Sequence, residues 1–141
     1  MGSVLTKEDF IKGQDHNFNF FVSPGIVDEV LEINNLLYIP GAETVSEFIY
    51  LYKKGYKIIK FFPANLNGEQ KKLQSIENIL KDIKFIPTGG ITNENVLSYL
   101  ALDNVMAVGA SALISPDLVN SKSWSEIKKN LKESKELITK S

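Results

Sequence analysis

The sequence predicts an α/β fold built on a parallel sheet, because short apolar runs alternate six times with longer segments of helical period. Most of the apolar runs end in Gly, Pro, Ser or Thr, as strands that enter loops tend to do. Strands that alternate with helices are joined by right-handed crossovers. This order fits both an open doubly wound sheet and a (β/α) barrel, and by itself it favours neither.

The apolar runs give six predicted strands, and the periodic segments give the predicted helices. The strands are Ser3–Leu5, Phe18–Ser23, Leu36–Pro40, Tyr56–Phe62, Lys84–Thr88 and Val105–Gly109. The helices are Lys7–Lys12, Ile26–Ile33, Thr44–Lys54, Glu69–Lys81, Asn93–Leu102 and Trp124–Ile138. The third helix has the clearest boundaries: Thr44 and Glu47 have the spacing of a capping box, and Gly55 follows the last turn.

The remaining helices are predicted from apolar spacing. Within Glu69–Lys81, apolar residues recur every three or four positions, and Thr92 is a candidate cap for Asn93–Leu102. In the last helix we expect one face to be buried, with Trp124 as an anchor in the core. The residues expected on that face are Trp124, Ile127, Leu131, Leu137 and Ile138. Lysines interleaved with acids form its solvated face rather than a nucleic-acid patch.

Composition excludes several classes of function. The chain has 141 residues, which corresponds to one domain over residues 1–141. Its formal net charge of −1 argues against bulk attraction to nucleic acid or anionic membrane. It contains no cysteine, so disulfides, thiolate nucleophiles and cysteine-bound metals are excluded. No run resembles a signal peptide or a membrane span, so a cytoplasmic protein is the default expectation.

Lys60 is the main candidate for chemistry. It lies near the end of a predicted strand that is apolar on both sides, and it shares one face with Ile58 and Phe62. Because parallel strands are usually covered on both faces, we expect the ammonium to be partly buried. Burial lowers the pKa of a lysine, and a neutral lysine can form a Schiff base with a ketone. The alternatives are a lysine that extends to solvent from a strand end and one that pairs with a carboxylate.

Two glycine loops are candidate phosphate sites. Gly89 and Gly90 follow one predicted strand and precede a helix, and Gly109 and Ser111 follow the next strand. Adjacent glycines let backbone N–H groups approach an anion, and barrels bind phosphate after their last two strands. A tight turn without a ligand is the alternative. The sequence has neither the dinucleotide fingerprint nor the Walker lysine motif.

Five short motifs occur in a fixed order along the chain, and together they carry a resemblance to a known protein family. They are Phe21–Gly25 (FVSPG), Ile39–Glu47 (IPGAETVSE), Lys60–Ala64 (KFFPA), Pro87–Ile91 (PTGGI) and Val108–Ser111 (VGAS). Together they resemble the 2-dehydro-3-deoxy-6-phosphogluconate (KDPG) / 4-hydroxy-2-oxoglutarate (KHG) aldolase family, and the similarity covers essentially the whole chain.

The resemblance implies a class I aldolase on a (β/α)8 TIM barrel, usually a homotrimer. Such an enzyme cleaves the phosphorylated keto acid to pyruvate and glyceraldehyde 3-phosphate, without a cofactor. By this resemblance Lys60 is the Schiff-base lysine. The phosphate-binding residues are Gly89, Gly90 and Ser111, and Thr88 and Pro63 line the site near the pyruvyl group. The sequence leaves open whether the substrate is KDPG or the shorter KHG.

The resemblance also implies an incomplete barrel, with about six of eight βα units. Gly2-Ser3-Val4 resembles the end of the family's third strand, so two units have no counterpart here. In the family those units carry the general acid/base glutamate and an arginine that holds the substrate carboxylate. The chain is interpreted first as a fragment, and otherwise as an enzyme that completes its site across subunits or as a sugar-phosphate-binding relative without turnover. A different barrel enzyme for a phosphorylated substrate is a further alternative.

Glu43 is a candidate substitute base. It follows the strand before the one with Lys60, at the end where barrel sites form. The alternative is a solvated acid at the start of the Thr44 helix. Asn65 stands where the family often has glutamate, and we assign it no role. His16 lies in a polar stretch without a partner and is interpreted as a loop residue, and no residue cluster has the spacing of metal ligands.

Overall fold

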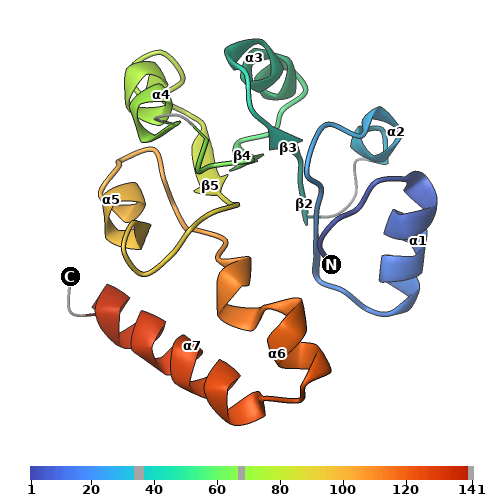
Figure 1. The fold of residues 1–141 in the computed structure, drawn as a ribbon. Helices are drawn as coiled ribbons and strands as arrows, with labels where there is room; N and C mark the ends of the chain where they lie inside the picture. Colours follow the sequence, from blue (N-terminus) through green and yellow to red (C-terminus); the bar gives the residue numbers. More distant parts are fainter. Residues whose placement is uncertain (34–36, 67–68, 140–141) are drawn as a thin grey trace.

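A computed structural model describes residues 1–33, 37–66 and 69–139 of the chain (Figure 1). The strands are β1 (Phe20–Val22), β2 (Leu37–Ile39), β3 (Gly41–Ala42), β4 (Ile58–Phe61) and β5 (Lys84–Pro87). The helices are α1 (Lys7–Asp15), α2 (Asp28–Leu31), α3 (Val45–Lys53), α4 (Glu69–Ile76), α5 (Val96–Leu100), the 3₁₀ helix η1 (Ser111–Ile114), α6 (Pro116–Asn120) and α7 (Trp124–Thr139). None of the helices in the described part is long and apolar enough to cross a membrane.

All the strand pairs are parallel, which confirms the predicted α/β class. β1 pairs with β2, and β4 lies between β3 and β5. Lys60 on β4 is in register with Gly41 on one side and Ile86 on the other. The strands lie inside an arc of helices, and among the described residues no element closes the arc between α6 and α1 (Figure 1).

Three predicted strands differ from those observed. Leu36–Pro40 becomes β2 followed by a separate β3, and its first residue lies outside the described residues. The break falls at Pro40, which has no N–H and whose carbonyl accepts a hydrogen bond from Lys60 N at 2.9 Å. Ser3–Leu5 and Val105–Gly109 are not regular strands. Ser3 has a positive φ of 56°, outside the extended region, and residues 105–109 contact β5 only through the isolated bridges of Val105 and Gly109.

An aromatic core lies between the sheet and the helices. The rings of Phe48 on α3, Phe61 on β4 and Phe85 on β5 are fully buried or nearly so, and their centroids lie 4.9–6.4 Å apart. These edge-to-face contacts stabilise the packing beyond the burial of area alone. Since side chains alternate along a strand, the burial of Phe61 against the helices directs Lys60 to the opposite face.

The capping box predicted for α3 is confirmed. Thr44 Oγ1 accepts a hydrogen bond from Glu47 N, and the Glu47 carboxylate accepts one from Thr44 N at 2.7 Å. A second capping box, formed by Thr6 and Asp9, begins α1, which continues three residues past the predicted end at Lys12. Asp9 shows the effect of this geometry: the backbone N–H of Leu5 donates to its carboxylate and lowers its pKa.

Three other helices are shorter than predicted, whereas α7 extends one residue past the predicted end at Ile138. Glu69–Lys81 ends at Ile76 in the structure, and Asn93–Leu102 begins only at Val96, after a turn in which the Asn95 side chain accepts from Thr92 N at 2.9 Å. Ile26–Ile33 is reduced to α2. The short α6 was not predicted separately, although Ser115 and the proline after it form a standard helix start.

The prediction for the apolar face of α7 is partly wrong. Ile127 is buried and Leu137 packs against the core, but Trp124, Leu131 and Ile138 are exposed. The helix follows the end of the arc, so the described chain covers only a narrow stripe of it (Figure 1). The lysines of α7 lie on the solvated face as expected, and two of them form i,i+4 ion pairs with glutamates.

The capping box allows a stability prediction. Thr44→Ala removes the acceptor for Glu47 N at the start of α3, so we expect the free energy of unfolding to fall by about 1 kcal/mol. The measurement is urea denaturation followed by circular dichroism. Ser46→Ala is the matched control, because Ser46 is exposed in the same turn and makes no side-chain hydrogen bond within the described chain. Equal losses in both variants would contradict the capping role.

Candidate active site

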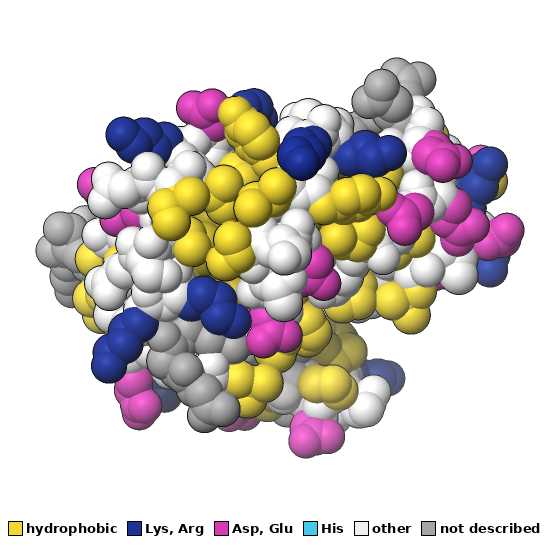
Figure 2. Space-filling model, turned by 90° about the horizontal axis from the view of Figure 1, so that it is seen from above, with side chains coloured by type: hydrophobic (Ala, Val, Ile, Leu, Met, Phe, Trp, Pro, Cys, Tyr) yellow, Lys and Arg dark blue, Asp and Glu magenta, His cyan; other side chains and the backbone are white. Residues whose placement is uncertain are grey.

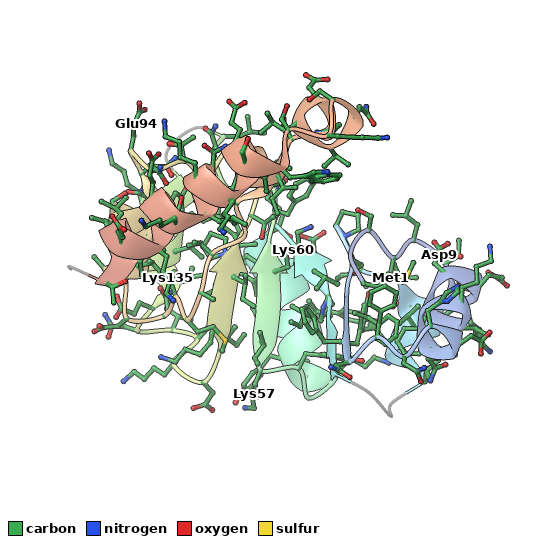
Figure 3. The ribbon with its side chains drawn as sticks, turned by 90° about the horizontal axis from the view of Figure 1, so that it is seen from below. Met1, Asp9, Lys57, Lys60, Glu94 and Lys135 are labelled. Atoms are coloured by element: carbon green, nitrogen blue, oxygen red, sulfur yellow. The ribbon has the colours of Figure 1, made fainter. Side chains whose placement is uncertain are left out.

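The candidate site begins with Lys60 near the carboxyl end of β4. Figure 3 shows Lys60 and Lys57 toward opposite ends of this strand. Lys57 is exposed, whereas only 9% of Lys60 is accessible to solvent. The expected burial of Lys60 is therefore confirmed. Its backbone is fixed by parallel neighbours on both sides, so the strand cannot turn this side chain out to solvent.

Burial lowers the pKa of the Lys60 ammonium below the usual lysine value. The Nζ atom lies 4.4 Å from the centre of the Phe62 ring, and it forms no hydrogen bond or ion pair within the described residues. The predicted alternative of a carboxylate partner is thus not found in this part of the chain. An amine in such surroundings is more easily deprotonated, and the neutral form is the nucleophile.

The loop after β4 is joined to the end of β5 by two backbone hydrogen bonds. Thr88 N donates to Phe61 O, and Ala64 N donates to Thr88 O, both at 2.9 Å. The Phe62 ring packs against Gly89: a Cβ atom on this glycine would lie 3.1 Å from the ring. One aromatic side chain therefore contacts both the lysine and the first glycine loop, with Pro63 beside it.

The glycine loops have little room for side chains. Gly90 has a positive φ of 72°, and a Cβ atom there would overlap the side chain of Asn65. Gly109 packs against Thr88 in the same way and donates its N–H to Pro87 O at 2.8 Å. Ser111 follows two residues later as the exposed first residue of η1. The two loops thus lie side by side at the carboxyl ends of β5 and of the neighbouring segment, residues 105–109.

Glu43 lies at the end of β3, but its carboxylate pairs with another side chain. Its Oε1 lies 3.6 Å from Lys72 Nζ on α4, and about half of the Glu43 side chain is exposed. Lys72 also approaches the Glu43 carbonyl, at 3.4 Å. This half-exposed, ion-paired carboxylate is closer to the alternative for Glu43, a solvated acid at the start of the Thr44 helix. Its role as a substitute base stays a prediction.

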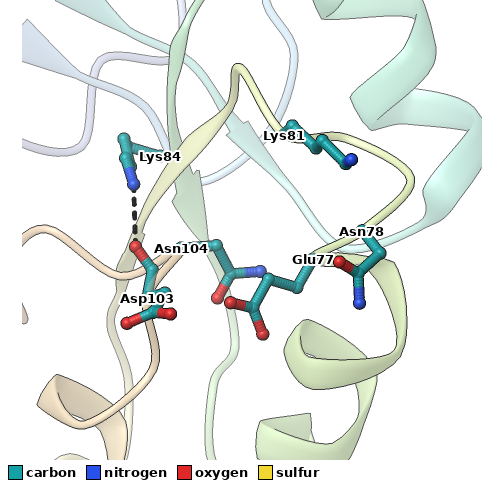
Figure 4. A pocket seen from close by; sticks show the side chains of 6 residues that line it. All are labelled: Glu77, Asn78, Lys81, Lys84, Asp103 and Asn104. Carbon is teal, nitrogen blue, oxygen red and sulfur yellow. Dashed lines mark hydrogen bonds between the residues drawn. The ribbon is translucent and has the colours of Figure 1, made fainter.

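The remaining polar residues of interest lie away from Lys60. His16 is exposed in the loop after α1, as interpreted from the sequence. A shallow pocket lies where β5 begins, lined by Glu77, Asn78, Lys81, Lys84, Asp103 and Asn104 (Figure 4). There Lys84 Nζ donates to Asp103 O at 2.7 Å. Among the described residues no cluster of three His, Asp or Glu side chains could hold a metal ion.

Two residues of the site were not assigned from the sequence. Phe62 contacts Lys60, and the alternation that places both on one face was the signal for it. Asn65 packs against Gly90, and no local pattern indicates that contact. The Phe62 ring links Lys60 to Gly89, and Gly109, two residues before Ser111, packs against Thr88.

The buried lysine and the glycine loops share the carboxyl edge of parallel strands, where α/β barrels place their active sites. These features define an α/β-barrel protein with a candidate Schiff-base lysine. A sequence profile of the aldolase family described as "KDPG and KHG aldolase" matches residues 1–130. The chain therefore belongs to this family.

Similar proteins agree with this assignment. The 2-dehydro-3-deoxy-phosphogluconate aldolase of Pseudomonas aeruginosa is 32% identical over 138 residues, which are 96% of this chain and 63% of that protein. The KHG/KDPG aldolase of Escherichia coli is 35% identical and is covered to 65% of its length. The chain thus spans slightly less than two thirds of these relatives.

Among solved structures, the KDPG aldolase of Legionella pneumophila superposes with a TM-score of 0.85 at 34% identity. The match covers 92% of this chain and 64% of that one. That structure contains pyruvate captured as a covalent carbinolamine intermediate. Since these aldolases have a TIM-barrel-like fold, the arc of Figure 1 is part of such a barrel, as predicted.

The burial of Lys60 predicts how stability depends on pH. Because its pKa is lower in the folded protein than in the unfolded chain, the unfolded chain binds more protons between these two values. Stability from this group is therefore lowest below the folded pKa and rises as the pH approaches 10.5, the usual lysine value. We expect Lys60→Met to stabilise the protein at pH 7, and this gain to shrink toward pH 10.

Between pH 7 and pH 10, the difference in the free energy of unfolding between Lys60→Met and wild type should change by about 1.4 kcal/mol for each unit by which the Lys60 pKa is lowered. It is measured by urea unfolding at several pH values. Lys57→Met, at the exposed residue just before β4, is the control. A constant difference between wild type and Lys60→Met over this range would contradict the lowered pKa.

Proposed function

We propose that the chain is the Schiff-base-forming part of a class I aldolase, a carbon–carbon lyase. The neutral Lys60 amine attacks the C2 ketone of a 2-keto acid to form a carbinolamine, whose hydroxyl takes up a proton and leaves as water to give a protonated imine. A general base then takes the proton of the C4 hydroxyl, the C3–C4 bond breaks with its electron pair passing to the imine, and an aldehyde is released while an enamine remains. Proton addition at C3 and hydrolysis of the imine then release pyruvate and regenerate the amine.

The burial of Lys60 is the observation that carries this proposal. An exposed lysine stays protonated at neutral pH, but this amine is held on a fixed strand with its ammonium form disfavoured. The carbinolamine trapped in the Legionella relative is an intermediate of the same chemistry. The reaction as written needs no cofactor.

The glycine loops support a phosphorylated substrate. Gly89 and Gly90 adopt the positive φ values that expose successive backbone N–H groups, and such groups bind anions. In this proposal they hold the terminal phosphate together with Ser111, and Thr88 and Pro63 line the pyruvyl end. The substrate is then KDPG, cleaved to pyruvate and glyceraldehyde 3-phosphate, or KHG, cleaved to pyruvate and glyoxylate.

The resemblance to the aldolase family also supports a proposal about the domain, the cellular location and the assembly of the protein. We place residues 1–141 in one incomplete barrel domain that acts in cytoplasmic carbohydrate metabolism, with a homotrimer as the expected assembly. The names of the relatives support the aldolase chemistry.

Borohydride trapping with pyruvate tests the first step. We expect reduction to fix pyruvate covalently on Lys60, located by peptide mass spectrometry. Lys60→Arg should abolish the adduct, because a guanidinium cannot form the imine, whereas Lys57→Arg should retain it. Inorganic phosphate that stabilises the protein without any adduct would instead favour the non-catalytic sugar-phosphate module.

We further propose that Glu43 transfers protons to and from the enamine. If so, Glu43→Gln slows solvent exchange of the C3 protons of pyruvate by about 100-fold. Glu77→Gln, at the opposite end of the strands, is the control and should leave exchange unchanged. The measurement is proton NMR in deuterated water. Unchanged exchange in Glu43→Gln would reject this role and leave the Schiff-base proposal standing.

A further inference from the structure

The shallow pocket where β5 begins brings charged side chains of both signs together without pairing them. Its lining comes from the turn after α4, the first residue of β5 and the turn before residues 105–109 (Figure 4). The charged residues of this polar pocket are Glu77, Lys81, Lys84 and Asp103. Within the described residues none of them forms an ion pair. The space between them, about 330 Å³, is large enough for a small molecule.

Asn104 is the buried polar residue of the polar pocket, and only 4% of it is accessible to solvent. Its Nδ2 atom donates to Leu73 O on α4 at 2.8 Å, and its backbone carbonyl accepts from Phe85 N on β5 at 2.8 Å. The side-chain Oδ1 atom is also buried, and it accepts no hydrogen bond from any described residue. Buried acceptors in folded proteins nearly always have a partner, because leaving one unsatisfied costs free energy.

The orientation of the Asn104 amide is fixed. If its oxygen and nitrogen were exchanged, Oδ1 would lie against Leu73 O, so that two acceptors would meet and the hydrogen bond would be lost. In Figure 4 the Asn104 oxygen and the Glu77 carboxylate face the same space. Ionised carboxylates are also acceptors only, so this part of the polar pocket requires a hydrogen-bond donor.

The two lysines of the polar pocket have the opposite requirement. The Lys84 ammonium donates to Asp103 O at 2.7 Å and has further N–H groups to donate. The Lys81 ammonium makes no hydrogen bond in the part of the chain that the structure describes. Because ammonium groups are donors only, a ligand beside them must offer acceptors. One occupant therefore needs a donor for the oxygens and an acceptor for the lysines.

The charge balance of the polar pocket favours a ligand that carries both signs. Two lysines and two acids line it, so their formal charges cancel. A metal cation alone would be repelled by the ammonium groups, and an anion alone by the carboxylates. On the face drawn in Figure 2, lysines and acids occur together and neither sign covers the surface alone. A zwitterion satisfies both sets of groups.

We propose that the polar pocket binds a small amino-acid zwitterion. Its ammonium group donates to the side-chain oxygens of Asn104, Glu77 and Asp103. Its carboxylate accepts from Lys81 and Lys84. Since Oδ1 of Asn104 is covered by its neighbours, a side chain of the lining shifts as the ammonium group enters. The pocket lies at the opposite end of β5 from the glycine loops, so this proposal does not depend on aldolase activity.

Titration of the full chain with unbranched amino acids tests the proposal. The probes are glycine, β-alanine, γ-aminobutyrate and 5-aminopentanoate, which differ in the distance between their two charges. Acetate, methylammonium and Mg²⁺ are the single-charge controls. Binding is measured by ¹H–¹⁵N NMR. We expect at least one zwitterion to saturate and to shift the side-chain amide signals of Asn104, and each control to bind at least about tenfold more weakly.

Matched substitutions test the location of binding. Glu77→Gln and Lys81→Met each remove one charge from the lining and should weaken binding at least about tenfold. Glu94→Gln and Lys71→Met remove an exposed acid and an exposed lysine outside the lining and should leave it unchanged. Circular dichroism checks that all four variants fold. The proposal is overturned if no zwitterion saturates, if a single-charge control binds equally well, if the Asn104 signals do not shift, or if the lining variants bind as tightly as their controls.

Discussion

The burial of one amine constrains the rest of this structure. Lys60 can stay inside only because β4 is paired with β3 and β5, which fixes its backbone, and because Phe61 is packed into the aromatic core, which fixes the direction of its neighbours. An ammonium group in this position loses hydration that the Phe62 ring replaces only in part. The free-energy cost is met by the surrounding core, and the result is an amine that releases its proton more readily than an exposed lysine.

The same hydrogen bonds that fix β4 also position the glycine loops. The pairing of Thr88 with Phe61 and Ala64 brings the end of β5 next to the loop after Lys60, so the Phe62 ring reaches Gly89. Gly90 has no space for a side chain because Asn65 occupies it, and its positive φ would strain any other residue. The lysine and the loops are therefore parts of one packed unit, and a change in the β4–β5 register would displace both.

Sequence patterns predicted the features that depend on local spacing. The capping box at Thr44, the parallel strand order and the inward face of Lys60 all follow from periods of two or 3.6 residues and from short motifs. Features that depend on residues distant in the sequence were either not predicted or predicted wrongly. Trp124 was expected in the core, but its helix lies at the end of the arc, where no described element covers that side. Asn65 has no local signal, since its contact with Gly90 exists only after β4 and β5 pair.

The position of the site within the arc keeps the lysine away from the two ends of the arc. β4 is the central strand of β3–β5, so the strand that carries the lysine is paired on both sides within the described residues. Within the described residues, Lys60 forms no ion pair with a carboxylate. Glu43, the acid at the end of the neighbouring strand, is paired with Lys72. The lowered pKa of the amine thus arises in the middle of the arc, and the proton transfer proposed for Glu43 requires its release from that ion pair.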